Sequence, residues 1–236
     1  MSHQRRIQTC ILRIKTLTDR ITKALKIGRD ISKFSTYSCQ PKNKYELKKI
    51  ITDRISKEGF KCDLNDIDTS LIDDMSGMFI RSDFNGDISN WDVSNVKNMA
   101  YMFEKAEFNG DISNWDVSRV KTTYGMFSKS KFNKDISKWN TSNVTEMSYM
   151  FNDSSFNKPI GDWDVSNVTI LTGMFRNSSF NQDINNWDVT NIKRMDNMFA
   201  NSSFNKDISS WNVRKDCDIK MMFNCCDIRD EFKPVL

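Results

Sequence analysis

The side chains that most often carry out catalysis or hold metal ions are scarce in this sequence. His3 is the only histidine, which nearly excludes triads, zinc sites and acid–base steps that depend on imidazole. The six cysteines include no Cys-x-x-Cys pair, and the adjacent Cys225 and Cys226 cannot be two arms of a usual zinc site, so we expect free thiols in a reducing compartment. No Walker loop and no Gly-x-Gly-x-x-Gly motif occurs. These residues predict a protein that is not an enzyme, binds no small-molecule substrate, and holds no cofactor and no metal.

A row of polar residues at intervals of 24 is the pattern that points to a binding surface. Each member directly follows a Trp: Asp92, Asp116, Asn140, Asp164, Asp188 and Asn212. Stacked carboxylates about 5 Å apart repel by about 3 kcal/mol per close pair at an effective dielectric constant near 20. Three interpretations are open: the side chains accept local backbone hydrogen bonds, they form a binding face for a basic partner, or they form a Ca²⁺ ladder.

A repeat of 24 residues must position this row. Phe recurs at that interval from residue 60 to 204, Trp from 91 to 211, and a Met-Phe pair from 78–79 to 222–223. In the unit 84–107 the spacing Ile88-x-x-Trp91-x-Val93 predicts a short strand entered from a turn. The following spacing, Val96-x-x-Met99-x-x-Met102, predicts a helical or 3₁₀ turn. Because one unit cannot bury its apolar residues alone, we expect seven coils stacked around one continuous core.

The unit resembles the BspA-like leucine-rich repeats, and more closely the related mycoplasma-lipoprotein repeats. Their hallmark is F-N-x-D-I-S-x-W-D-V-S-N-V-x-x-M-x-x-M-F, which residues 84–103 match in full and residues 180–199 nearly so. The resemblance covers about residues 60–227. It implies an α/β repeat fold, a right-handed, leucine-rich-repeat-like solenoid with one short parallel strand and one helical or 3₁₀ turn per coil. It also implies a role in adhesion or in contacts between proteins.

Two helices are predicted ahead of the repeats. Residues 43–57 have Asn43 as N-cap, Glu46 as its capping-box partner, and Gly59 after the end. We expect this helix to cap the first coil through an apolar stripe of Tyr45, Ile50, Ile51 and Ile55.

Residues 4–27 form a second, amphipathic pattern, rich in Arg and Lys. Its contact face consists of Ile7, Ile11, Ile14, Leu17, Ile21 and Leu25. The pattern predicts self-association or packing on a partner. Binding to an anionic membrane surface or to nucleic acid are the alternatives.

The charge divides the chain in two. Residues 1–59 hold 15 Lys and Arg against 5 Asp and Glu, whereas residues 60–236 hold 20 against 26. We therefore expect a basic helix and linker over 1–40, a capping helix over 41–59, repeats over 60–227 and a tail over 228–236. No signal peptide and no membrane span is recognisable, which predicts a protein in the cytoplasm, or within a virion or host cell.

The function predicted from these features is a non-catalytic protein–protein interaction scaffold. Its partners would be other proteins, bound on the exposed row and on the variable corners between coils. The alternative is a structural component of a larger assembly, tethered by the basic N-terminal helix, or a membrane- or nucleic-acid-associated protein that uses the same helix.

Overall fold

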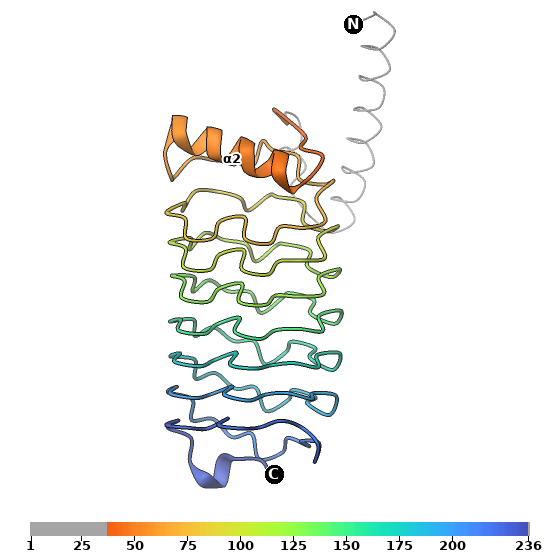
Figure 1. Ribbon diagram of the computed structural model, residues 1–236, viewed down its shortest axis with the longest axis vertical. Helices are drawn as coiled ribbons and strands as arrows, with labels where there is room; N and C mark the ends of the chain where they lie inside the picture. Colours follow the sequence, from red (N-terminus) through yellow and green to blue (C-terminus); the bar gives the residue numbers. More distant parts are fainter. Residues whose placement is uncertain (1–36, 236) are drawn as a thin grey trace, which may run out of the picture. The chain divides into compact units, whose positions relative to one another are not determined.

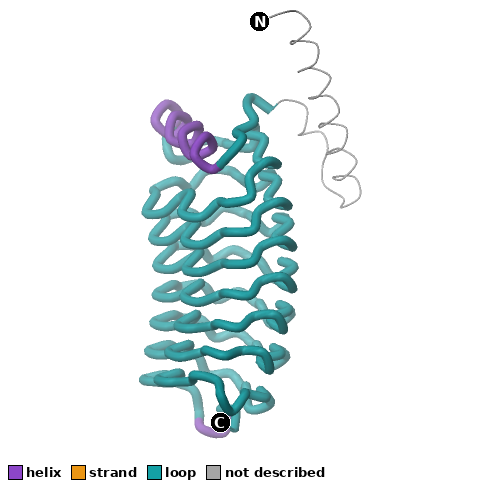
Figure 2. The backbone as a smooth tube through the Cα atoms, turned by 45° about the vertical axis from the view of Figure 1, so that its right-hand side comes forward, coloured by secondary structure: helices purple, strands orange, loops and turns teal. Residues whose placement is uncertain are grey.

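A computed structural model describes residues 37–235 of the chain, which divides into two compact units, Met1–Cys39 and Gln40–Leu236. In its described residues the second unit has one α-helix, α2 (Lys44–Glu58), and one 3₁₀ helix, η2 (Asp230–Phe232). Between them the chain winds into successive coils that stack along one direction (Figure 1), and Figure 2 shows that these coils consist of turns and loops. The predicted contact face from Ile7 to Leu25 lies outside the described residues.

Helix α2 begins and ends at the residues that the capping pattern indicates. The Asn43 side chain accepts hydrogen bonds from the backbone N–H groups of Tyr45 and Glu46, each at 3.0 Å. Gly59 follows the helix with a φ of 85° and returns its N–H to the carbonyl of Ile55. Asn43 is thus the N-cap and Gly59 the C-cap, as their residue types predict.

The buried stripe of α2 differs from the predicted one. Leu47 and Ile51 are buried, whereas Tyr45 is 83% exposed. Tyr45 lies in the first helical turn, beyond the apolar core that Leu47 enters, so its place in the predicted stripe is corrected. The helix therefore contacts the core through a narrower stripe.

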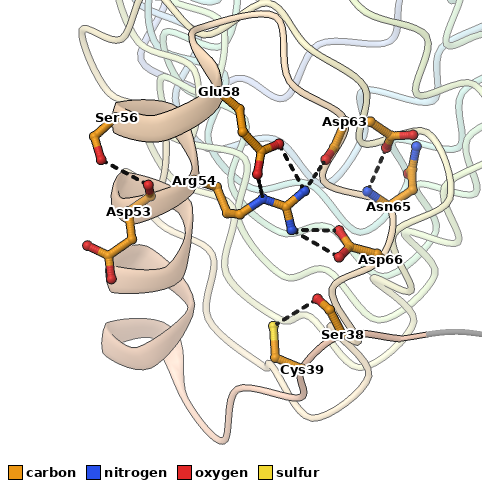
Figure 3. A network of polar contacts seen from close by, with 9 residues as sticks. All are labelled: Ser38, Cys39, Asp53, Arg54, Ser56, Glu58, Asp63, Asn65 and Asp66. Atoms are coloured by element: carbon orange, nitrogen blue, oxygen red, sulfur yellow. Dashed lines mark hydrogen bonds and ion pairs between the residues drawn. The ribbon is translucent and has the colours of Figure 1, made fainter.

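An arginine fastens α2 to the first coil (Figure 3). Arg54 donates to both carboxylate oxygens of Asp66 at 3.1 and 2.9 Å and to the carbonyl of Asp63 at 3.0 Å, and it pairs with Glu58 one helical turn away. The hydrogen bond to Asp66 is the largest cause that raises the pKa of Arg54 above its usual value. Arg54, together with the buried side chains of Leu47 and Ile51, holds α2 across the end of the stack.

Each coil is a series of tight turns that brings apolar residues inward. In the second coil, 84–107, backbone hydrogen bonds close turns from Ile88 to Trp91, from Val93 to Val96 and from Met99 to Met102, at 2.9–3.2 Å. Apolar residues at both ends of such a turn, three apart in sequence, lie on the same side of the chain. This explains why the three-residue spacing runs through the whole unit.

The parallel backbone bridges that recur from coil to coil lie in a different segment from the predicted strand. No extended strand occurs in residues 37–235; six successive parallel bridges instead join Asp74, Asn98, Thr122, Glu146, Ile170, Arg194 and Asp218. The predicted strand at residues 91–93 is an irregular segment between two turns, and the predicted helical turn near Met99 contains the bridge residue Asn98. No longer helix forms near Met99, because Tyr101 has a left-handed conformation, with a φ of 57°, that ends a helix after one turn.

The core is a set of columns of identical side chains. Phe103 stacks on Phe79 and on Phe127 with ring centroids 5.5 Å apart, and Phe108 stacks on Phe132 at 6.3 Å. Each Trp also donates its indole N–H to a carbonyl of the preceding coil, as Trp91 does to Leu64 at 2.9 Å. Apolar stacking and these buried hydrogen bonds fix the register between coils, and the same register brings chosen surface positions into rows.

Candidate interaction face

Comparison of the coils separates the side chains that the fold requires from those it leaves free. From the second coil on, the Phe that begins each coil is followed by an Asn. The fold requires this Asn, because its side-chain oxygen accepts the backbone N–H of the same position in the next coil. Asn85, for example, accepts from Asn109, and Asn133 accepts from Asn157, at 2.9 and 3.0 Å. A second Asn, such as Asn143, donates its amide to the preceding coil, here to the carbonyl of Ser118 at 2.8 Å. Such residues recur because stacking depends on them.

The predicted acidic row also has a task within its own coil. Asp116 accepts from the backbone N–H of Ser118 at 3.2 Å and from its hydroxyl at 2.6 Å, and Asp188 makes the same pair of contacts with Thr190 at 3.1 and 2.6 Å. These hydrogen bonds lower the pKa of Asp188. The row's members are half-buried (Asp92, Asp116) or exposed (Asn140, Asp164, Asp188, Asn212).

The row therefore has a local structural explanation, and its use as a binding face stays a prediction. The described residues contain no group of three His, Cys, Asp or Glu side chains that could hold a metal ion.

Another set of positions varies from coil to coil. It comprises the bridge residue and the residues two, three and six further along, and we call it the ladder face. From the second to the sixth coil these positions are Asn98, Ala100, Tyr101 and Glu104; Thr122, Tyr124, Gly125 and Ser128; Glu146, Ser148, Tyr149 and Asn152; Ile170, Thr172, Gly173 and Arg176; Arg194, Asp196, Asn197 and Ala200. Since only the backbone of these positions takes part in the regular contacts between coils, their side chains are free to differ.

Three tyrosines from successive coils meet on the ladder face. The ring of Tyr124 lies edge-to-face with Tyr101, at a centroid distance of 5.0 Å and an angle of 65°, and with Tyr149, at 5.6 Å and 64°. Tyr101 is 40% exposed, and the other two are half-buried. The three rings form a continuous aromatic surface, which we call the tyrosine cluster.

Glycines in the neighbouring coils make room for these rings. A Cβ atom at Gly125 would lie 2.9 Å from the Tyr101 ring, and one at Gly173 would lie 2.5 Å from the Tyr149 ring. Both glycines have a φ of 58°, so the same residue satisfies the left-handed backbone and the space that the ring needs. The alternation of Tyr and Gly at this position thus seats two of the three rings.

Two phenol groups of the cluster, those of Tyr124 and Tyr149, have raised pKa values. Burial is the largest cause that raises the pKa of Tyr124 to about 12, followed by a hydrogen bond with Tyr101 and by the charges of Glu146 and Glu104. Burial likewise raises the pKa of Tyr149. At neutral pH the cluster therefore offers apolar ring surface together with uncharged hydroxyl groups.

Polar groups follow the cluster along the stack. Asp196 accepts from Thr172 at 2.7 Å and pairs with Arg194 at 3.3 Å. Tyr149 lies within electrostatic range of Asp196 and Arg176. An aromatic centre with a polar, charged surround is the composition of a protein-binding surface, because aromatic residues bury a large area and the polar groups around them set the orientation of the partner.

The sequence analysis did not identify the tyrosine cluster. Tyr101 and Tyr149 occupy the same coil position 48 residues apart, whereas Tyr124 lies one position earlier in its coil. The signal available in the sequence was that three of the five tyrosines gather in three successive coils. The offset of Tyr124 conceals the contact, because only the turn geometry shows that adjacent coil positions reach the same surface.

No helix in the described part of the chain is long and apolar enough to cross a membrane. In comparisons with known proteins, a family model described as "Mycoplasma protein of unknown function, DUF285" matches residues 46–155 and, in a second overlapping segment, residues 128–232. No curated protein and no solved structure matches the chain.

Proposed function

Since the chain belongs to the DUF285 family of repeat-containing proteins, whose function is unknown, we propose from its own surface that it is a non-catalytic scaffold that binds another protein. The tyrosine cluster on the ladder face is the observation that carries this proposal. The fold class in the proposal is the one predicted from the sequence, a right-handed solenoid of the leucine-rich-repeat type. Six successive parallel bridges and the stacked Phe columns support it.

The tyrosines of the ladder face differ from the other recurring residues in making no side-chain hydrogen bond that the coils require. The Asn columns, the buried Trp column and the acidic row all make hydrogen bonds that the coils require. The three tyrosines make no such recurring contact, yet they place aromatic surface where no other coil has an aromatic residue. Exposed aromatic surface costs solubility and adds nothing to the coil hydrogen bonds, and recognition of a partner is the role that it suits.

The rigidity of the stack suits the same role. Ring stacking continues through the coils, and backbone hydrogen bonds join every coil to the next. A surface that is already ordered loses little conformational entropy when a partner binds. We therefore place the recognition centre at Tyr124, with Tyr101 and Tyr149 at its sides.

The experiment is to select peptides on the immobilised full chain from a random peptide library, and to measure their affinities for two matched variants. The first variant replaces the cluster, Y101S/Y124S/Y149S. The control replaces three members of the acidic row, D116N/D164N/D188N, and keeps an oxygen acceptor at each position. Hydrogen exchange of the core amides checks that both variants keep the native fold.

We expect selected peptides to bind the cluster variant at least about 30-fold more weakly, since an aromatic hot spot contributes about 2 kcal/mol or more. The control should bind as the unchanged chain does. Peptides that bind the cluster variant normally would refute the proposal. If binding is lost in the control alone, the acidic row is the recognition surface, as the sequence predicted.

A further inference from the structure

Each of the first six coils donates four backbone N–H groups to the next coil. In the sixth coil, 180–203, the donors are Met195, Asn197, Phe199 and Asn201, and their partners are carbonyls of the seventh coil at 2.8–2.9 Å. The earlier coils make the same four bonds, since Met99, Tyr101, Phe103 and Lys105 donate to the third coil at 2.8–3.1 Å. Along this segment, each of these coils presents N–H donors toward the next coil and carbonyl acceptors toward the preceding one.

Within the described residues, no further coil supplies carbonyls to the donors of the seventh coil. The equivalent N–H groups belong to Ile219, Met221, Phe223 and Cys225, and within residues 37–235 none of them has a hydrogen-bond partner. Met221 is 51% exposed and Cys225 is exposed. We call these four residues the open edge.

The tail closes only the other half of this end. The carbonyl of Phe232 accepts from Ile208 at 3.0 Å, Arg229 donates its N–H to Asn205 at 3.1 Å, and Ile228 is buried. These residues continue the start of an eighth coil. Lys233 places its ammonium 5.7 Å from the centroid of the Phe223 ring and is the tail residue that reaches the open edge.

Apolar surface remains uncovered beside the open edge. Val213, Ile219 and Phe223 are only half-buried, although their equivalents in the sixth coil are at most 1% exposed: Val189, Met195 and Phe199. A further half-coil would bury these three side chains and satisfy the four donors together. The missing element is therefore defined both by hydrogen-bond polarity and by apolar contact.

The opposite end of the stack is closed. Helix α2 packs there, with Lys44 paired to Asp74 at 3.5 Å and Lys48 donating to the carbonyl of Gly77 at 3.4 Å. The carbonyl row that could continue the ladder of a second copy lies at this capped end. Head-to-tail stacking of two copies would have to displace α2, so the second copy is a poor occupant of the open edge.

We propose that the open edge binds a segment of a different polypeptide, which adds a half-coil to the stack. The segment runs parallel to residues 219–225, presents its alternate carbonyls to the four N–H groups, and places apolar side chains over Val213, Ile219 and Phe223. Its pattern is that of the coil segment itself, Met-x-x-Met-Phe, because the equivalent segment of the seventh coil accepts the four donors of the sixth coil and stacks Phe223 on Phe199. This site is separate from the tyrosine cluster and stands without it.

The probe is a synthetic peptide with the sequence of residues 98–107, NMAYMFEKAE, added to the full chain. Its control replaces both Met and the Phe by Ser. Fluorescence anisotropy should give a Kd below about 1 mM for the peptide and no binding for the control. At saturation, exchange of the amide protons of Ile219, Met221, Phe223 and Cys225 should slow at least about tenfold.

Matched variants test the placement. I219K/F223K should abolish peptide binding, whereas I80K, at the capped end, and Y101S/Y124S/Y149S should leave it unchanged. Retention of binding by the last variant distinguishes this site from the proposed recognition centre. If I219K/F223K unfolds the last coil, the amide-exchange measurement on the unchanged chain still shows whether the peptide binds at the open edge.

Three results would overturn the proposal. These are no binding at about 1 mM peptide, binding that leaves the four amides unprotected, or concentration-dependent self-association of the full chain that protects the same four amides. The last result would assign the open edge to a second copy.

Discussion

A buried threonine in the Met column leads to a sharp stability prediction. Thr123 stands where the neighbouring coils have Met99 and Met147, is 4% exposed, and has no hydrogen-bond partner for its hydroxyl group. Thr141 is a matched contrast: it replaces a column Val, is 3% exposed, and donates to the carbonyl of Asp164 at 2.9 Å. The two threonines share burial and differ in whether the hydroxyl is satisfied.

Replacement by the isosteric Val should therefore act in opposite directions. Thr123→Val removes a buried, unpaired hydroxyl and should stabilise the fold by about 1 kcal/mol. Thr141→Val removes a donor and leaves a carbonyl unpaired, and should destabilise it by about 1 kcal/mol. Thr123→Met should stabilise the fold further, because it restores the side chain that the neighbouring coils have at this position, Met99 and Met147.

The assay is urea denaturation, with the midpoint shift read at constant m value, and a thermal scan as a second measure. For a chain of this size 1 kcal/mol corresponds to a shift in Tm of about 2–4 °C, so the two Val variants should differ by about 4–8 °C. If Thr123→Val lowers the midpoint as Thr141→Val does, the hydroxyl of Thr123 has a partner and the reasoning fails.

Three further predictions concern the coils and the cluster. Asn133→Ala should lower the free energy of unfolding by about 1 kcal/mol, because it strands the next coil's N–H group, whereas Asn133→Asp keeps the acceptor and should lower it less; equal losses in urea denaturation would contradict this. Gly173→Ala should destabilise the fold more than Gly77→Ala, although both sites have a φ near 58°. The new Cβ would lie 2.5 Å from the Tyr149 ring at Gly173, whereas the nearest atom at Gly77 is 3.8 Å away. Equal shifts in Tm for the two variants would exclude the ring contact. In a titration followed by tyrosinate absorbance Tyr124 should ionise near pH 12, and because its folded pKa exceeds the unfolded value of 10, stability should fall as the pH rises from about 10 to 12; ionisation near pH 10 would contradict the buried site.

The capping helix was predictable because its signals are local. Asn43 and Gly59 act on the backbone within a few residues of themselves, so their effect is readable from neighbours in sequence. The exposed position of Tyr45 was not readable, since it depends on where the first coil ends beneath the helix.

The acidic row illustrates a partial success. Its regular spacing correctly indicated a row of related side chains, and one of the three interpretations, local hydrogen bonding, describes the contacts of Asp116 and Asp188. Repetition in every coil is the expected mark of such a task, because each coil must form the same turn. Variation between coils, as on the ladder face, instead marks side chains that the coil itself does not determine.

The sequence by itself determined the 24-residue period, the apolar columns and the cap, because identical side chains at a fixed interval can be buried together only if each coil packs on the next. Only the tertiary structure decided which segment of the coil joins its neighbours, because the left-handed φ of Tyr101 turns a helical spacing into a bridge. It also brought Tyr101, Tyr124 and Tyr149 together and left four N–H groups of the last coil without a partner in residues 37–235. The cluster depends on contacts between residues 23 and 25 positions apart, and no local pattern encodes how the coil is oriented when those contacts form.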